Sequence, residues 1–387
     1  MIFYSNLAFL ALVAVSVLAA PAPEPGQNPE QLLKPPVRGR SLNLALRDPV
    51  EFDIYRGRYE ECTRIGKGTS GTVYDCAFGK TRVAVKECWE DPRDPDSVVW
   101  FKDCMREPKI LTALKEIKGI THLIDSELRT YDSGQRQFLM SMELGRGKSL
   151  AWAIDDLQYP HGESGMTLRL NVLEVAYTLK SMARRGWVHG DVKPDNLVFM
   201  DTYSEGQPRG ELRLIDMGSA QYVGEVDPKD KTKQWMKLDR VVGTPDYVPP
   251  SISNFVDESL QDPLKRDVWA YGQTVYTMLT GQPAEYTLWS SFLKKNLDER
   301  KDYLMQRAGI KSNSPITRLL AEIFVELDDD RPTMKQVVDI LKSTTQEEWF
   351  EVSKQAGEAR VRRRGEPEDA PSDCKQSDES HAESDVN

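Results

Sequence analysis

The segment "IGKGTSGTVY" (Ile65–Tyr74) constrains the fold of this 387-residue chain more than any other. It places Gly66, Gly68 and Gly71 at the tip of a hairpin between two segments with the composition of strands. Glycines at such a tip let backbone N–H groups approach phosphate oxygens closely. A dinucleotide-binding turn would continue into a helix, whereas a strand pattern follows here, which argues against that fold. Since glycine-rich hairpins are common, the residues that follow must decide what this one does.

Lys86 follows in "VAVKE", an otherwise apolar strand pattern. A lysine in such a strand is unfavourable unless it is paired or faces solvent at a sheet edge. After a glycine-rich hairpin, the pattern favours a lysine that holds phosphate, with Glu107 of the helical segment 97–114 as its partner. Pro108 disfavours helical geometry at Glu107, so the helix is expected to begin or to kink there.

The polar run "HGDVKPDN" (189–196) is the second chemical motif. Asp191 can orient a substrate hydroxyl and accept its proton, and Lys193 can neutralise a transferring phosphoryl group. Asn196, together with Asp216 of "IDMGSA", offers oxygen ligands of the kind that Mg²⁺ prefers. Each residue alone is an ordinary polar group of a loop. Together, and after the glycine hairpin and the strand lysine, they indicate phosphoryl transfer.

Strand patterns dominate the chain up to about residue 150, and long helical patterns dominate the rest of the region 54–350. The expected fold class is therefore α+β, with a small β-rich lobe that holds one helix and a larger helical lobe. In their order along the chain, the hairpin, the strand lysine, the helix glutamate, the run 189–196 and "DMG" resemble the motifs of eukaryotic protein kinases. The resemblance covers residues 58–345 and includes "GTPDY" (Gly243–Tyr247), "DVWAYG" (Asp267–Gly272) and "DDRP" with Arg331.

The resemblance implies a bilobal kinase fold and an enzyme that transfers the γ-phosphate of ATP, with Mg²⁺ as cofactor, to hydroxyl groups of a protein substrate. Asp191 and Lys193 are the implied catalytic residues, and Asn196 and Asp216 are the implied Mg²⁺ ligands. Lys193 with Thr244 resembles the serine/threonine branch of the family.

The nucleotide site that the resemblance implies is built by residues of both lobes. Met142 would be the gatekeeper before a hinge at 143–145, and Val73, Ala84 and Val198 would enclose the adenine. The full set of implied ATP-binding residues is Ile65, Gly66, Gly68, Gly71, Val73, Ala84, Lys86, Glu107, Met142, Glu143 and Val198.

Three positions depart from the family pattern, and none of them removes a catalytic group. Gly190 stands where many members have an arginine that binds a phosphorylated activation loop, so activity without such phosphorylation is expected. Met217 replaces a phenylalanine, a change of similar volume that should be mild. Ser251 replaces a glutamate expected to pair with Arg331, which therefore needs another acceptor.

An active protein serine/threonine kinase is the leading hypothesis, and two alternatives remain open. A pseudokinase would keep the fold as a binding or scaffold module without turnover; only Pro108 and Ser251 favour it. A kinase-fold enzyme that phosphorylates a small molecule is disfavoured because "GTPDY" matches a segment that positions peptides.

The ends of the chain differ in composition from the region 54–350. Residues 7–20 are apolar and too few to span a bilayer comfortably, so 1–19 are predicted to be a signal peptide, with an uncleaved anchor as the alternative. Residues 20–53 are predicted to be a proline-rich linker or propeptide, and 351–387 a disordered acidic tail. The protein would be secreted or lumenal, with no membrane span after signal cleavage.

The net charge and the spacing of the cysteines argue against two kinds of ligand, nucleic acid and a structural zinc ion. The net charge is −10 and the pI near 5.2, so an electrostatic nucleic-acid binder is not expected. The five cysteines contain no CxxC pair, which argues against a structural zinc site. The basic cluster 360–364 fits either a solvated group or a processing site after Arg364.

Four cysteines, Cys62, Cys76, Cys88 and Cys104, fall in the expected β-rich lobe. Counting outward from the hairpin tip places Cys62 across from Ala77, so no bridge to Cys76 is expected. Cys88 and Cys104 come together if the strand lysine meets the helix glutamate. They would then be packed thiols in a reducing compartment or a disulfide in an oxidising one.

Overall fold

The computed structural model describes residues 58–68, 71–145, 148–155, 165–204, 207–224, 243–249, 262–284, 294–310, 314–325 and 330–365. The chain divides into two units, and the first, Met1–Asp48, lies outside these residues. The predicted signal peptide (1–19) and linker (20–53) also lie outside them and stay predictions. Everything that follows concerns the second unit.

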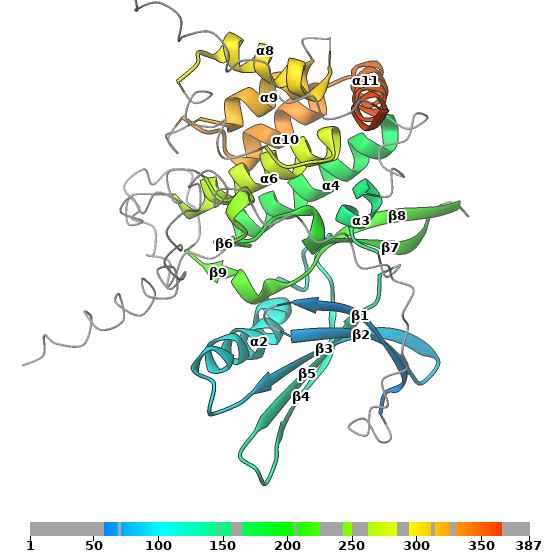
Figure 1. Ribbon diagram of the computed structural model, residues 1–387, viewed down its shortest axis with the longest axis vertical. Coiled ribbons are helices and arrows are strands. Elements are labelled where there is room, and N and C mark those ends of the chain that lie inside the picture. Colours follow the sequence, from blue (N-terminus) through cyan, green and yellow to red (C-terminus); the bar gives the residue numbers. More distant parts are fainter. Residues whose placement is uncertain are drawn as a thin grey trace, which may run out of the picture. The chain divides into compact units, whose positions relative to one another are not determined.

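The first lobe is a five-stranded antiparallel sheet with the order β1-β2-β3-β5-β4 and one helix, α2 (Figure 1). Because side chains alternate along each strand, the sheet has two buried faces. On the face under α2, strand residues such as Cys88 and Met140 share a core with Phe101 of the helix. The elements are β1 (Glu60–Gly68), β2 (Gly71–Phe78), β3 (Thr81–Glu90), α2 (Pro95–Leu114), β4 (Leu123–Thr130) and β5 (Arg136–Glu143).

The opposite face of the sheet carries a second apolar cluster. Its members, all from the first lobe, are Tyr59, Cys62, Tyr74, Cys76, Val83, Val85 and Leu139. Tyr59 and Phe78 pack here with ring centroids 5.5 Å apart. The sheet is therefore held by separate apolar cores on its two sides, and only one of them lies beside α2.

The pairing of β1 with β2 is irregular, and the irregularity changes which cysteines meet. The register shifts at Ile65, an extra residue of β1 between two consecutive cross-strand pairs. Such a bulge moves every earlier residue of the strand by one position. Cys62 consequently forms a disulfide with Cys76. The expectation that these cysteines stay apart is wrong, because it assumed a regular ladder.

Helix α2 runs unbroken from Pro95 to Leu114, although Pro108 lies inside it. Glu107 therefore sits within the helix, so the first of the two alternatives, a helix that begins at this point, is wrong. Cys104 of α2 forms a disulfide with Cys88 of β3, which is the second of the two alternatives that the sequence left open.

The second lobe is mainly helical, so the predicted α+β fold with a small β-rich lobe and a larger helical lobe is confirmed (Figure 1). Two short antiparallel sheets pair β6 with β9 and β7 with β8. Central helix α6 is buried along almost its whole length and is capped by Asp262 and Gly281. The elements are α3 (Leu150–Asp155), α4 (Gly165–Arg184), β6 (Trp187–Val188), β7 (Leu197–Ser204), β8 (Gln207–Leu214), β9 (Gln221–Tyr222), α6 (Pro263–Thr280), α8 (Leu297–Ala308), α9 (Pro315–Ile323), α10 (Met334–Ser343) and α11 (Gln346–Gly365).

Helix α11 corrects the predicted boundary of the tail. Disorder was expected from residue 351, but the helix continues to Gly365, and Trp349, Val352 and Ala356 are completely buried in the core of the second lobe. Apolar residues spaced three and four apart give the helix this buried face. Cleavage after Arg364 stays a prediction, and a protease would have to unwind the end of α11 to reach that bond.

Within the described part of the chain, no helix combines the length and the apolar character that crossing a bilayer requires.

Candidate active site

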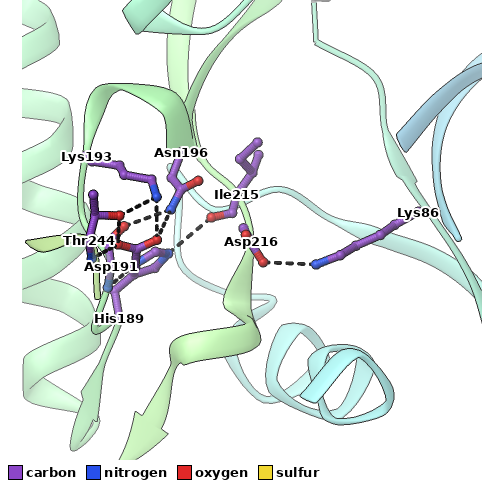
Figure 2. Close-up of polar contacts among 8 residues, drawn as sticks. All are labelled: Lys86, His189, Asp191, Lys193, Asn196, Ile215, Asp216 and Thr244. Carbon is purple, nitrogen blue, oxygen red and sulfur yellow. Dashed lines mark hydrogen bonds and ion pairs between the residues drawn. The ribbon is translucent and has the colours of Figure 1, made fainter. Parts of the chain in front are cut away.

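Asp191 lies on the loop between β6 and a short 3₁₀ helix, η3 (Pro194–Asn196), and its carboxylate is held from three directions (Figure 2). Oδ1 accepts hydrogen bonds from the backbone N–H and the Oγ1 hydroxyl of Thr244, each at 2.8 Å. Oδ2 accepts one from Nδ2 of Asn196 at 3.0 Å and lies 2.8 Å from Nζ of Lys193. These contacts fix the position of the carboxylate.

Lys193 and Thr244 connect the loop that carries Asp191 to the segment 243–249. Nζ of Lys193 donates to Oγ1 of Thr244 at 2.6 Å, and that hydroxyl donates onward to Asp191. The sequence placed these two residues together as a mark of the serine/threonine branch, and the structure brings them into direct contact. An ammonium group beside the carboxylate is placed to neutralise charge on a phosphoryl group.

His189 and Asp267 hold the loop that carries Asp191 by accepting hydrogen bonds from its backbone N–H groups. Asp267 of α6 accepts the backbone N–H groups of His189 at 2.7 Å and Gly190 at 2.9 Å, and burial raises the pKa of this carboxyl. Nδ1 of His189 accepts the N–H of Asp191, while Nε2 lies 3.1 Å from the carbonyl of Ile215. This pattern fits the neutral tautomer that carries its hydrogen on Nε2, because a carbonyl only accepts. His189 therefore couples the Asp191 loop to the strand that presents Asp216.

Gly190 itself adopts a left-handed conformation with φ of 80°. A side chain is disfavoured in this conformation. The backbone geometry thus accounts for glycine at this position. The motif "DVWAYG" was noted in the sequence, but the supporting roles of Asp267 and His189 were missed, since no spacing rule connects them to Asp191.

The second half of the site joins the lobes through Lys86. Nζ of Lys86 is paired with Oε1 of Glu107 on α2. The same Nζ lies 2.9 Å from Oδ1 of Asp216 (Figure 2). The side chains of Lys86 and Glu107 are almost completely buried, with exposed fractions of 6% and 1%, whereas 41% of the Asp216 side chain is exposed. The predicted Lys86–Glu107 pair is therefore present, and Asp216 reaches the same ammonium.

In the triad of Lys86, Glu107 and Asp216, the pKa values of the two carboxyl groups are shifted in opposite directions. Burial raises the pKa of Glu107 to about 7, against the opposing attraction of Lys86. Burial also acts on Asp216, but the Lys86 ammonium outweighs it and lowers the pKa to about 2. Burial alone would lower the pKa of Lys86; the charges of Glu107 and Asp216 raise it instead. Lys86 and Asp216 are consequently charged at neutral pH, and Glu107 titrates near it.

The residues expected to surround the adenine come from both lobes. Ala84 and Met142 lie opposite each other across β3 and β5, and Val73 lies opposite Lys86 across β2 and β3. A Cβ added to Gly145 of the hinge would lie 2.2 Å from Cγ1 of Val198, so the hinge backbone packs directly on that side chain. Contact of these residues with a nucleotide stays a prediction.

The glycines on the two strands of the hairpin differ in how closely other atoms approach them. Gly66 lies opposite Val73 and Gly68 opposite Gly71, beyond the half-buried Ile65 at the bulge. A Cβ at Gly71 would lie 2.4 Å from the carbonyl oxygen of Glu87, whereas a Cβ at Gly68 would meet nothing within 4 Å. Packing thus requires glycine at position 71, whereas the space around Gly68 would admit a side chain.

Glu143 differs from the other implied ATP-binding residues. Its carboxylate lies 3.0 Å from Nη1 of Arg213 on β8 and 3.0 Å from Nδ1 of His122. These partners hold the side chain, so only the backbone of Glu143 is available to face a nucleotide. The ion pair with Arg213 joins the hinge to the second lobe, and no pattern in the sequence predicted it.

Asn196 and Asp216 fit the donor set that Mg²⁺ uses. Nδ2 of Asn196 is bound to Asp191, which leaves the amide oxygen as a possible ligand, and the low pKa of Asp216 keeps its carboxylate ionised. No cluster of three or more His, Cys, Asp or Glu residues suited to a metal occurs in the described ranges. Mg²⁺ commonly takes one or two protein ligands and completes its shell with phosphate and water.

Two departures from the family pattern are resolved by the structure. Met217 is completely buried beside α2, as expected of a replacement of similar volume. Arg331 is 1% exposed and donates to the backbone carbonyls of Ile323, Lys265 and Val325 at 3.0–3.1 Å. Its guanidinium also lies over the ring of Trp269 at 5.1 Å. The three carbonyl oxygens accept from Arg331 in place of the glutamate that the family pattern would supply.

Comparison with known proteins gives one consistent result. A family model described as the protein kinase domain matches residues 59–341. The probable serine/threonine-protein kinase mps1 of Dictyostelium discoideum is 24% identical over 289 residues, 72% of this chain and 27% of that protein. The serine/threonine-protein kinase MPS1 of Saccharomyces cerevisiae is 26% identical over 68% of this chain and 32% of its own length. The serine/threonine-protein kinase max-2 of Caenorhabditis elegans is 27% identical over 64% and 35%.

The chain thus spans only about a third or less of the length of these relatives, and what they share with it is one domain. Members of that family generally use ATP with Mg²⁺ and act on proteins. The match covers both lobes and every motif on which the resemblance to protein kinases was based. This chain belongs to the protein kinase family.

Proposed function

We propose that this chain is an ATP-dependent protein serine/threonine kinase. The observation that carries the proposal is the network of Asp191, Lys193 and Thr244, in which a fixed carboxylate, an ammonium group and a hydroxyl meet within 2.6–2.8 Å. The intact Lys86–Glu107 pair supports an active arrangement of the other half of the site. No described feature of the site favours a pseudokinase.

In this proposal each residue has one task. Asp191 orients the substrate hydroxyl and accepts its proton, and Lys193 neutralises charge that develops on the transferred group. Lys86 holds ATP phosphates, and the glycine hairpin encloses them with its backbone N–H groups. Asn196 and Asp216 would hold Mg²⁺, which screens the phosphate charge when it is bound.

Asp191→Asn tests the activity. It should reduce phosphate transfer to a general acceptor such as casein by about 10³-fold or more, because it removes the base and keeps the shape. Binding of Mg²⁺ and ATP, followed by calorimetry, should change little. Asp339→Asn is the control, since it makes the same chemical change at an exposed position of α10. If wild type and Asp191→Asn bind nucleotide and are equally inert, the chain is a pseudokinase.

We propose further that residues 1–19 direct the chain into the secretory pathway and are removed on entry. Two buried disulfides within one lobe support an oxidising compartment, because cytosolic thiols are kept reduced. The apolar run at 7–20 supports the same route. Expression in eukaryotic cells with a C-terminal tag, followed by N-terminal sequencing of the protein in the medium and in the lumen, tests this. Protein found only in the cytosol with Met1 intact would contradict it.

A further inference from the structure

Helix α2 has an internal weak point next to its functional glutamate. Pro108 has no N–H, so the carbonyl of Cys104 lacks its normal donor in the helical ladder, and the proline ring crowds that same carbonyl. Glu107 lies directly before Pro108 and three residues after Cys104, on the same side of the helix. The turn that carries the partner of Lys86 is therefore an internal turn that lacks one backbone hydrogen bond.

The Cys88–Cys104 disulfide reaches this turn. Cys104 is the residue whose carbonyl Pro108 leaves without its donor, and its sulfur is bonded to that of Cys88. Cys88 lies two residues beyond Lys86 on the same face of β3. The disulfide and the Lys86–Glu107 pair are thus two parallel links between β3 and α2, one covalent and one ionic.

The same disulfide also touches the glycine hairpin. A Cβ added to Gly71 would lie 3.0 Å from Sγ of Cys88, so the end of the hairpin packs on the sulfur. Both cysteines are almost completely buried, with exposed fractions of 1% and 0%. Three elements of the nucleotide site, β3, α2 and the hairpin, therefore meet at one disulfide.

The second disulfide of the lobe provides a comparison. Cys62–Cys76 closes a sequence separation of 14 residues, and Cys88–Cys104 one of 16. Cys62 and Cys76 belong to the apolar cluster on the face of the sheet away from α2, with Tyr59 and Val83. The two bonds resemble each other in span and burial, but only one adjoins the site.

We propose that the Cys88–Cys104 disulfide is a positioning element of the kinase reaction: it holds α2 where Glu107 pairs with Lys86, across the backbone defect made by Pro108. The inference rests on the kinase activity proposed above. The disulfide touches no substrate and acts through the ion pair. It also gives a physical reason for activity without a phosphorylated activation loop, because α2 is held covalently.

Non-reducing peptide mapping of the secreted protein is the first test, and free alkylated Cys88 and Cys104 would overturn the proposal. Cys88→Ala with Cys104→Ala should then lower kcat/KM for ATP by about tenfold or more at a temperature where the variant is folded. Cys62→Ala with Cys76→Ala is the matched control and should change it by less than about twofold. If the alanine pair does not fold, Cys88→Val with Cys104→Val keeps an apolar filling.

A double-mutant cycle separates positioning from mere stability. In a Glu107→Gln background the ion pair is already lost, so removing Cys88–Cys104 should add less than about twofold. An equal loss in both backgrounds, or an equal loss on removing Cys62–Cys76, would overturn the inference. The dissociation constant for Mg²⁺ and ATP is measured in the same variants. If the wild type transfers no phosphate, the proposed activity is refuted. The dissociation constants would then still show whether removing Cys88–Cys104, and not Cys62–Cys76, weakens nucleotide binding.

Discussion

Trp349 on α11 offers the most direct test of where the folded domain ends. The side chain is completely buried, with an exposed fraction of 0%, although the family match ends at residue 341. Trp349→Ala removes a large buried ring and leaves a cavity, which costs about 3–5 kcal/mol. The free energy of unfolding of a native protein is about 5–15 kcal/mol, so this loss is a large share of the total stability.

Phe350, the next residue, is 46% exposed and supplies a matched control. Phe350→Ala should cost less than about 1 kcal/mol, because nearly half of its surface already contacts water. Circular dichroism at 222 nm during thermal and urea unfolding would measure both variants. At about 2–4 °C per kcal/mol, Trp349→Ala should lower the Tm by about 6 °C or more. Equal Tm values for the two variants would show that α11 is not packed on the second lobe.

Three further predictions concern the site. The activity of wild type should fall below a pH of about 7 as Glu107 protonates, and Glu107→Gln should show no such fall in a pH–rate profile. Because the folded pKa lies above the ordinary 4.5, the same carboxyl makes the fold less stable as pH rises between these values, which urea unfolding of both proteins would detect. Gly71→Ala should raise the KM for ATP by about tenfold, since its Cβ would meet a carbonyl of β3 at 2.4 Å, while Gly68→Ala should be nearly neutral in the same assay. Phosphatase treatment, or Ser219→Ala with Thr232→Ala, should change the rate by less than about threefold, and a hundredfold loss would refute independence from loop phosphorylation.

The catalytic motifs were predictable because each is local. Asp191, Lys193 and Asn196 lie within six residues, and their side chains meet in the structure as the spacing indicates. The Lys86–Glu107 pair was also predicted, since a buried lysine in a strand requires a partner. The supporting carboxylate of Asp267 was not, because it reaches the loop from a distant helix and only the fold defines that contact.

The errors have local causes as well. One extra residue at Ile65 reversed the expected facing of Cys62, and a bulge of this kind leaves no mark in the strand pattern. The tail was assigned to disorder because its composition is polar. A signal was nevertheless present in the sequence, because Thr345 and Glu348 have the spacing of a capping box. At the start of α11 the side chain of each accepts a hydrogen bond from the backbone N–H of the other.

The order of the disulfides has a consequence for how the chain is made. Each bond joins a cysteine to the next one along the chain, Cys62 to Cys76 and Cys88 to Cys104. Four cysteines allow three pairings, and this is the one in which no link encloses or crosses another. During translocation each thiol would find its native partner before the following pair emerges, so that oxidation can proceed from the N-terminus during synthesis. We therefore expect folding in the cell to require oxidation of these thiols but little help from a disulfide isomerase. Pulse-labelled chains can be trapped by alkylation to test this. Accumulation of mispaired forms would contradict the expectation.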